Sequence, residues 1–138
     1  MAIVVDTNVL FAFVNAEEKN HERVAEFIMS ANDVLLIPAT VLPEVDYLIT
    51  KYLDVRSELA LLRDIAAHNY RLENLTDDDV ARCIELIDQY ADSDIGLVDS
   101  SVVAVAERLN ITRILTLDHR RFGIIRPRHC AFFDLLPH

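Results

Sequence analysis

The fold of this chain follows from residues 2–10, which read AIVVDTNVL. Residues 2–5 form an unbroken apolar run, a pattern typical of a strand buried on both faces within a parallel sheet. The run ends on Asp6, Thr7 and Asn8, after which a helical apolar pattern begins. Asp6 is therefore predicted at the carboxyl end of a strand, the edge of an open α/β sheet where ligands bind. The simpler interpretation is that Asp6 or Thr7 caps the following helix.

Length and composition indicate one domain, residues 1–138, with a substantial core. The chain is 52% hydrophobic and has only two glycines and four prolines, which argues against disorder. The first apolar run is interrupted by Asp6 and has no basic residue before it, so it is neither a signal peptide nor a membrane span, and a cytoplasmic location is expected. Cys83 and Cys130 lack metal-ligand spacing and are expected to be reduced thiols.

Charge is distributed unevenly along the chain. The net charge of −10 argues against tight non-specific binding of nucleic acid. Residues 1–106 carry 20 acids and seven basic residues, whereas residues 107–138 carry six arginines and three acids. We expect a polyanion to meet the C-terminal segment first.

Further apolar runs predict strands at residues 34–37, 70–75, 114–117 and 130–133. Helical spacing predicts helices ending at about Val14 and spanning approximately residues 20–31, 40–53, 54–67, 76–91 and 99–109. Strands that alternate with helices indicate an α/β fold, with a central, mostly parallel five-stranded sheet and helices on both faces. Right-handed crossovers then bring the strand carboxyl ends to one edge.

The predicted helix after Thr76 begins with three acids. Acids in a first turn are favoured by the helix dipole, so we expect Asp77, Asp78 and Asp79 to be solvated. The expected buried stripe of this helix is Val80, Cys83, Ile84, Ile87 and Ala91.

Three further acids share features with Asp6. Glu44 lies on the apolar face of its predicted helix, where a carboxylate is costly unless something neutralises it. Asp99 lies on the same face as the apolar stripe of its predicted helix, one turn toward the N-terminus. Asp118 follows the fourth predicted strand as Asp6 follows the first. A favourable first-turn acid or a helix cap is the simpler interpretation of each.

Together, these four carboxylates are predicted at one edge of the sheet, where they would repel one another without a cation. Oxygen ligands with no neighbouring His or Cys select Mg²⁺ or Mn²⁺ over Zn²⁺. Such an ion keeps bound waters and contacts phosphate oxygens, which suits the hydrolysis of phosphodiester bonds.

Four segments resemble the acidic motifs of PIN-domain ribonucleases, specifically the bacterial VapC-type toxins. They are residues 3–10 (IVVDTNVL), the pair Pro43-Glu44, residues 96–104 (GLVDSSVVA) and residues 115–122 (LTLDHRRF). The resemblance implies a PIN-like fold and a Mg²⁺- or Mn²⁺-dependent endoribonuclease that leaves 5′-phosphate and 3′-hydroxyl ends on RNA. It also implies a homodimer and an inhibitory, VapB-like antitoxin partner.

The resemblance also assigns roles by position. Asp6 and Asp99 would be the direct metal ligands, and Glu44 and Asp118 would complete the acidic site. The residues expected to orient water or phosphate are Thr7, Asn8 and Thr116.

Neighbouring residues extend this site. Arg120 and Arg121, at the start of the basic C-terminal segment, can contact phosphates that flank the scissile bond. Asp92 and Asp94 are close enough in sequence to Asp99 to join the site, although a surface loop is the preferred interpretation.

Two other functions fit parts of the sequence. In an aspartyl-phosphate phosphatase Asp6 would be the nucleophile, but that chemistry normally uses a second Asp two residues later, where this chain has Asn8. In a non-catalytic binding module the acids would only cap helices, which does not explain Glu44 on an apolar face.

Overall fold

The structure, a computed structural model, describes all 138 residues. The strands are β1 (Ala2–Val5), β2 (Val34–Pro38), β3 (Arg71–Glu73), β4 (Arg113–Leu115) and β5 (Asp134–Leu136). The helices are α1 (Thr7–Val14), α2 (His21–Ser30), α3 (Val41–Tyr52), α4 (Val55–Ala66), α5 (Asp77–Gln89), the short 3₁₀ helix η1 (Ala91–Ser93), α6 (Leu97–Arg108) and α7 (His119–Ile124).

The five strands form one sheet in the order β3-β2-β1-β4-β5, and every pair is parallel. The predicted α/β class and five-stranded sheet are confirmed, and the sheet is fully parallel. From β1 the chain builds outward through β2 and β3, and then returns to add β4 on the other side. The strand order therefore reverses between β1 and β4, which is where open α/β sheets bind ligands.

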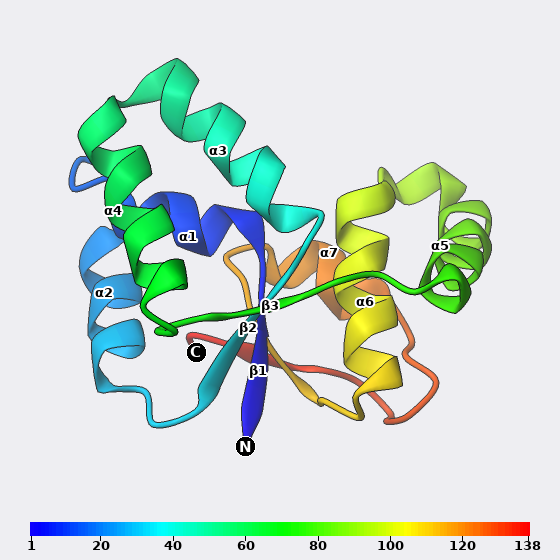
Figure 1. The fold of residues 1–138 in the computed structure, drawn as a ribbon. Coiled ribbons are helices and arrows are strands. Elements are labelled where there is room, and N and C mark those ends of the chain that lie inside the picture. Colours follow the sequence, from blue (N-terminus) through cyan, green and yellow to red (C-terminus); the bar gives the residue numbers. More distant parts are fainter.

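Helices cover both sides of the sheet (Figure 1). Helices α1 to α4 gather on one side, and α5 and α6 lie on the other. Helix α6 is buried almost all round, with every residue from Ser100 to Ala106 buried, as expected of a helix that lies between the sheet and α5. Strand β1 is equally enclosed, because Ile3, Val4 and Val5 have no exposed surface.

The last strand lies further along the chain than predicted. The apolar pattern placed it at residues 130–133, whereas β5 is Asp134–Leu136, paired with β4 through Arg113↔Asp134 and Leu115↔Leu136. Residues 130–133 instead form an irregular connection in which Phe133 packs against the core. A short apolar run does not distinguish a strand from a packed loop, because both bury the same side chains.

The predicted buried stripe of α5 was largely wrong. Cys83 is buried, but Val80, Ile84 and Ile87 are 45%, 65% and 37% exposed. The inward face instead carries Asp79, Cys83 and Leu86. Asp77 and Asp78 are exposed as predicted, whereas Asp79 is buried because Arg108 of α6 donates to both of its carboxylate oxygens, at 3.1 and 3.0 Å. Ala91, at the end of the predicted stripe, is exposed and lies in η1.

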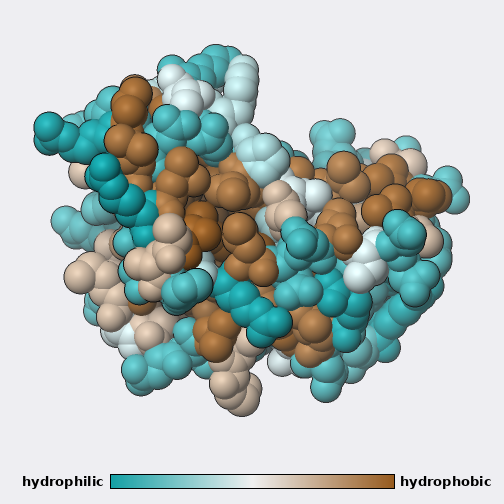
Figure 2. Space-filling model, viewed as in Figure 1, coloured by the Kyte–Doolittle hydropathy of each residue, from teal (hydrophilic) through white to brown (hydrophobic).

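Several apolar side chains remain on the surface. Figure 2 shows apolar patches over the α3–α4 side of the molecule and over α5. Exposed apolar residues on these elements are Tyr47, Tyr52, Val55, Leu59, Leu62, Val80, Ile84 and Ile87. None of the helices has the length and apolarity needed to cross a membrane.

Candidate active site at the carboxyl ends of β1 and β4

A small acidic pocket opens where the strand order reverses. Its volume is about 160 Å³, and it brings together all four acids singled out from the sequence. Its lining is Asp6, Thr7, Asn8, Glu44, Leu48, Asp99, Asp118 and Arg121. Strand β1 supplies Asp6 at its end, α3 and α6 supply Glu44 and Asp99 in their first turns, and the turn after β4 supplies Asp118.

Asp6 is the most enclosed of these carboxylates, at 5% exposure. Its Oδ1 accepts from the backbone N–H of Thr7 at 2.8 Å, and its Oδ2 accepts from Thr116 Oγ1 at 2.8 Å. The pKa of Asp6 is raised to about 6, mainly by burial. The two hydrogen bonds lower this pKa, and the charges of Asp99 and Glu44 raise it. Asp6 therefore acts as the N-cap of α1 and also lines the pocket, so the cap interpretation is confirmed and does not exclude a role in the site.

Arg121 is the one cation in the pocket, and it binds two of the acids. Its Nη1 donates to Asp99 Oδ2 at 3.1 Å, and its Nε lies 3.5 Å from Asp118 Oδ2. Burial raises the pKa of Asp99, the charge of Arg121 lowers it, and the charges of Asp118 and Glu44 raise it again, with a net upward shift. The guanidinium thus offsets only part of the cost of burying this carboxylate.

Glu44 stands at the rim of the pocket. The sequence predicted a carboxylate beside a buried stripe, and Val41 and Val45 are indeed fully buried, but Glu44 itself is exposed. The start of its helix is tied to α6 by a hydrogen bond between the Thr40 and Ser101 hydroxyls, and Glu44 and Asp99 line the same pocket.

Thr116 and Asn8 connect the two strand ends. Thr116 is fully buried behind Asp6, receives a hydrogen bond from Asp118 N at 3.0 Å, and does not line the pocket. Asn8 does line it, and its Oδ1 accepts from Leu117 N at 3.0 Å. Of the residues predicted to orient water or phosphate, Thr7 and Asn8 reach the pocket, whereas Thr116 reaches it only through Asp6.

The pocket suits a hard divalent cation, although its carboxylates are not drawn together around one. No set of three or more His, Cys, Asp or Glu side chains is close enough to hold a metal ion. Every donor in the lining that could bind a cation is nevertheless an oxygen, as Mg²⁺ and Mn²⁺ prefer. The buried Thr7 Oγ1 has no hydrogen-bond partner in the protein, and a cation-bound water would supply one. Arg121 Nη1 occupies Asp99 Oδ2, and both oxygens of Asp6 accept hydrogen bonds, from Thr7 N and Thr116 Oγ1.

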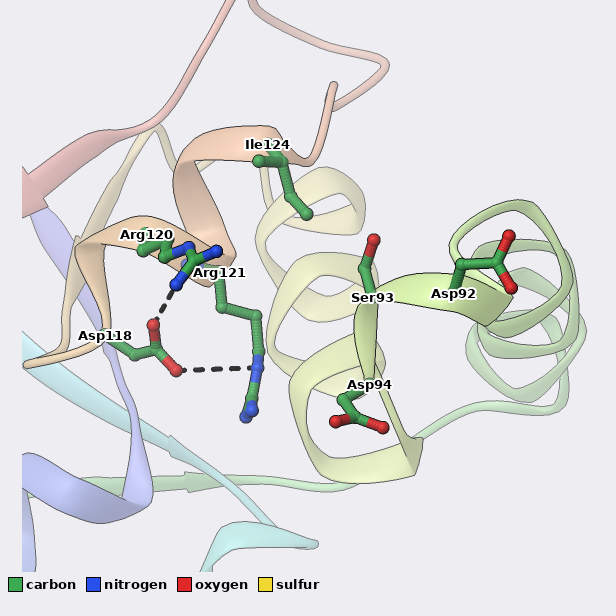
Figure 3. A pocket seen from close by; sticks show the side chains of 7 residues that line it. All are labelled: Asp92, Ser93, Asp94, Asp118, Arg120, Arg121 and Ile124. Atoms are coloured by element: carbon green, nitrogen blue, oxygen red, sulfur yellow. Dashed lines mark hydrogen bonds and ion pairs between the residues drawn. The ribbon is translucent and has the colours of Figure 1, made fainter.

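A second, larger cavity adjoins the first (Figure 3). It measures about 510 Å³ and lies between η1 and α7, sharing Asp118 and Arg121 with the acidic pocket. Arg120, predicted to contact phosphate, lines this cavity and does not reach the acidic pocket. Neither α7 nor η1 was predicted, because neither helix is long enough to show a helical period of apolar residues.

Comparisons with known proteins agree with this fold. Residues 3–125 match the PIN domain family. The chain is 34% identical over 135 residues to the Mycobacterium tuberculosis protein named ribonuclease VapC26, covering 98% of this chain and 100% of that protein.

Two solved structures share the architecture. Mycobacterium tuberculosis VapC20, described as a sarcin-ricin loop cleaving toxin, aligns with a TM-score of 0.79 at 22% identity, over 86% of this chain and 92% of VapC20. A chain of Rickettsia felis VapBC2, solved with a DNA fragment from its promoter, aligns with a TM-score of 0.70 at 16% identity, over 99% and 100% of the two chains. At these identities the structures support the fold, and the sequence matches identify the family. The chain belongs to the PIN-domain family, among its VapC-type members.

Proposed function

We propose that this protein is a Mg²⁺- or Mn²⁺-dependent endoribonuclease and the toxin of a toxin–antitoxin pair. The observation that carries the proposal is the convergence of Asp6, Glu44, Asp99 and Asp118, from four separate segments, on one pocket at the reversal of strand order. A relative named as a ribonuclease that matches nearly the full length of the chain supports RNA as the substrate.

Each side chain has a distinct task in this proposal. Asp6 and Asp99 hold the divalent ion, which when bound activates water and stabilises charge on the phosphate. Glu44, exposed at the rim, and Asp118 complete the acidic site and hold waters by their carboxylates. Thr116, through its 2.8 Å hydrogen bond, keeps Asp6 turned toward the pocket. The Thr7 hydroxyl and the Asn8 amide orient water or phosphate.

An aspartyl-phosphate mechanism fits less well. In that chemistry the residue two positions after the nucleophile serves as acid and base, whereas Asn8 cannot titrate and accepts the Leu117 N–H. The Asp6 carboxylate is also engaged at both oxygens, by Thr7 and Thr116, which lowers its nucleophilicity.

An antitoxin and a second copy of the chain are the partners we propose. Structural relatives include the VapBC2 complex of Rickettsia felis and a toxin–antitoxin complex from Klebsiella pneumoniae. The apolar surfaces over α3–α4 and α5 offer area for both contacts. An enzyme that cuts RNA and is restrained by such a partner would act in the cytoplasm.

The test is cleavage of end-labelled RNA by purified protein with Mg²⁺, with Mn²⁺ and with EDTA. We expect cleavage only with metal, and we expect Asp99→Asn to lower the rate by at least about 100-fold, because the change removes a charge that holds the ion. Asp46→Asn is the matched control: Asp46 lies on the same helix as Glu44 but outside the pocket, and its variant should cleave like the wild type.

Two results would contradict the proposal. One is cleavage that persists in EDTA. The other is an Asp99→Asn variant that cleaves at the wild-type rate under saturating Mg²⁺.

A further inference from the structure

Two acids of the candidate site are carried by the first turns of two different helices. Glu44 lies in the first turn of α3 and Asp99 in the first turn of α6, and both line a space of about 160 Å³. Two carboxylates in so small a space repel each other when no cation is bound. The starts of the two helices nevertheless lie side by side (Figure 1). The contact that holds them together therefore bears on the geometry of the site.

One hydrogen bond between side chains joins the two helices. Thr40, the N-cap of α3, and Ser101 of α6 place their hydroxyl oxygens 2.5 Å apart. No other side-chain hydrogen bond and no ion pair links residues 40–52 to residues 97–108. Elsewhere α3 packs against α1, α4 and β2. The hydroxyl pair is thus the polar link that opposes the repulsion between the two acidic turns.

The protons of this hydroxyl pair have a defined direction. Ser101 Oγ lies 2.7 Å from the carbonyl oxygen of Val98, which can only accept, so Ser101 donates its one hydroxyl proton there. Thr40 must then donate to Ser101. The chain of bonds runs from the start of α3, through the fully buried Ser101, to the residue that precedes Asp99.

Thr40 makes this bond in place of capping its own helix. A threonine at an N-cap normally accepts from the N–H of the second or third helical residue, but Thr40 has helical backbone angles and makes no such bond. Pro43 is the third helical residue and has no N–H to offer. The proline that precedes Glu44 thus removes one of the two capping partners and leaves the Thr40 hydroxyl available to α6.

We propose that Thr40 and Ser101 are positioning residues, whose hydroxyl bond fixes the two acidic first turns relative to each other. Neither side chain lines the pocket, so both act through Glu44 and Asp99. The inference rests on the proposed function, because the spacing of these acids matters where they hold a divalent ion and its waters.

Calorimetric titration with Mn²⁺ in the absence of RNA tests the link. Thr40→Val removes the hydroxyl and keeps the shape of the side chain, and it should weaken Mn²⁺ binding by about 10-fold, as loss of a group that orients metal ligands does. Thr40→Ser keeps the hydroxyl and should bind Mn²⁺ like the wild type. Thr50→Val is the matched control, because the hydroxyl of this exposed α3 residue bonds only to the Tyr47 carbonyl within the helix.

A double variant separates the link from general damage to the fold. Ser101→Ala alone should weaken Mn²⁺ binding as Thr40→Val does. The two changes together should weaken it no more than the larger single effect, because both remove the same bond. In cleavage assays at subsaturating Mn²⁺, Thr40→Val should lower kcat and leave the KM for RNA near the wild type, because Thr40 does not line the pocket.

The outcomes distinguish the positioning role from the activity. Wild-type Mn²⁺ affinity in Thr40→Val, failure of Thr40→Ser to restore binding, or additive losses in the double variant overturn the positioning role and leave the ribonuclease intact. A wild type that binds no Mn²⁺ overturns the proposed metal-dependent function, and the positioning role with it.

Discussion

Asp6 combines a structural and a chemical role within one side chain. Its pKa is raised from 3.8 to about 6, mainly by burial, so the folded protein holds this proton more tightly than the unfolded chain does. The free energy of unfolding of the metal-free protein should therefore fall as pH rises from 3.8 to about 6 and remain lower above that range.

Asp6→Asn should remove this pH dependence. At pH 7.5 in EDTA we expect the variant to be more stable than the wild type by roughly 1–3 kcal/mol, with little difference near pH 4. An asparagine oxygen can still accept from Thr7 or Thr116. Urea unfolding at the two pH values measures the effect, and a variant less stable at both would mean that Asp6 serves the fold only as a cap.

Arg121 forms ion pairs with Asp99 and Asp118, so under the proposed function it would compete with the divalent cation for these carboxylates. We expect Arg121→Gln to bind Mn²⁺ at least about fivefold more tightly, because the ion no longer displaces a positive charge. The same variant should melt at a lower temperature in EDTA, since Asp99 loses its counter-charge. Calorimetric titration with Mn²⁺ and melting curves provide the two readouts.

Arg120→Gln is the control for this prediction. It removes the same charge one residue earlier, outside the acidic pocket, and should leave both the Mn²⁺ affinity and the melting temperature in EDTA near the wild type. Equal Mn²⁺ affinities for Arg121→Gln and wild type would show that the guanidinium and the metal do not compete.

At the level of elements, α5 and α6 are joined by a largely buried ion pair. Arg82 Nε and Nη2 donate to the two Glu107 oxygens at 2.8 and 3.0 Å, and the side chains are 11% and 9% exposed. Burial raises the pKa of Glu107, but hydrogen bonds from Arg82 and from the Arg128 backbone outweigh it, and the net shift is downward. The pair supports η1 and Asp99 indirectly, because α5 leads into η1 and α6 carries Asp99.

Glu107→Gln should destabilise the protein by about 3 kcal/mol at pH 7, because it leaves the Arg82 charge buried without its partner. The pKa of Glu107 is lower in the folded protein than in the unfolded chain. The stability that Glu107 contributes is therefore present above the unfolded pKa and is lost as pH falls through the folded pKa. The difference between variant and wild type in urea unfolding should therefore shrink toward pH 3. Glu85→Gln, at a half-exposed acid that also contacts Arg82, should cost less than about 1 kcal/mol, and an equal loss in both would contradict a special role for the buried pair.

At the scale of the whole molecule, the exposed apolar surface predicts self-association. On α5, Val80, Ile84 and Ile87 follow one another at helical spacing on a single exposed face. We expect a homodimer in sedimentation equilibrium, and Ile84→Lys, at the centre of the row, should shift the protein toward monomer. Met29→Lys, at an exposed apolar residue of α2 outside both apolar surfaces, is the control and should leave the dimer unchanged. A wild type that remains monomeric at high concentration and low salt would contradict the dimer.

Local sequence patterns were sufficient to predict several elements of this protein. Strands β1 and β2 could be predicted because burial on both faces requires an unbroken run of apolar residues. The acids at the strand and helix ends could be predicted because each one ends or begins such an apolar pattern within a few residues. Asp6, Glu44, Asp99 and Asp118 were predicted to converge because parallel strands end at one edge of a sheet. The structure brings these four residues into one pocket.

The pairing of charged side chains could not be predicted and is seen only in the folded protein. Asp79 lies inside and pairs with Arg108, 29 residues away, while the apolar row of α5 faces outward. Arg121 binds Asp99 across 22 residues, inside the site rather than on its periphery. The end of β1 and the position of Asp6 after it could be predicted from the residues alone, since they depend on neighbours along the chain. The pairing of charged groups depends on distances between elements, which no local period encodes.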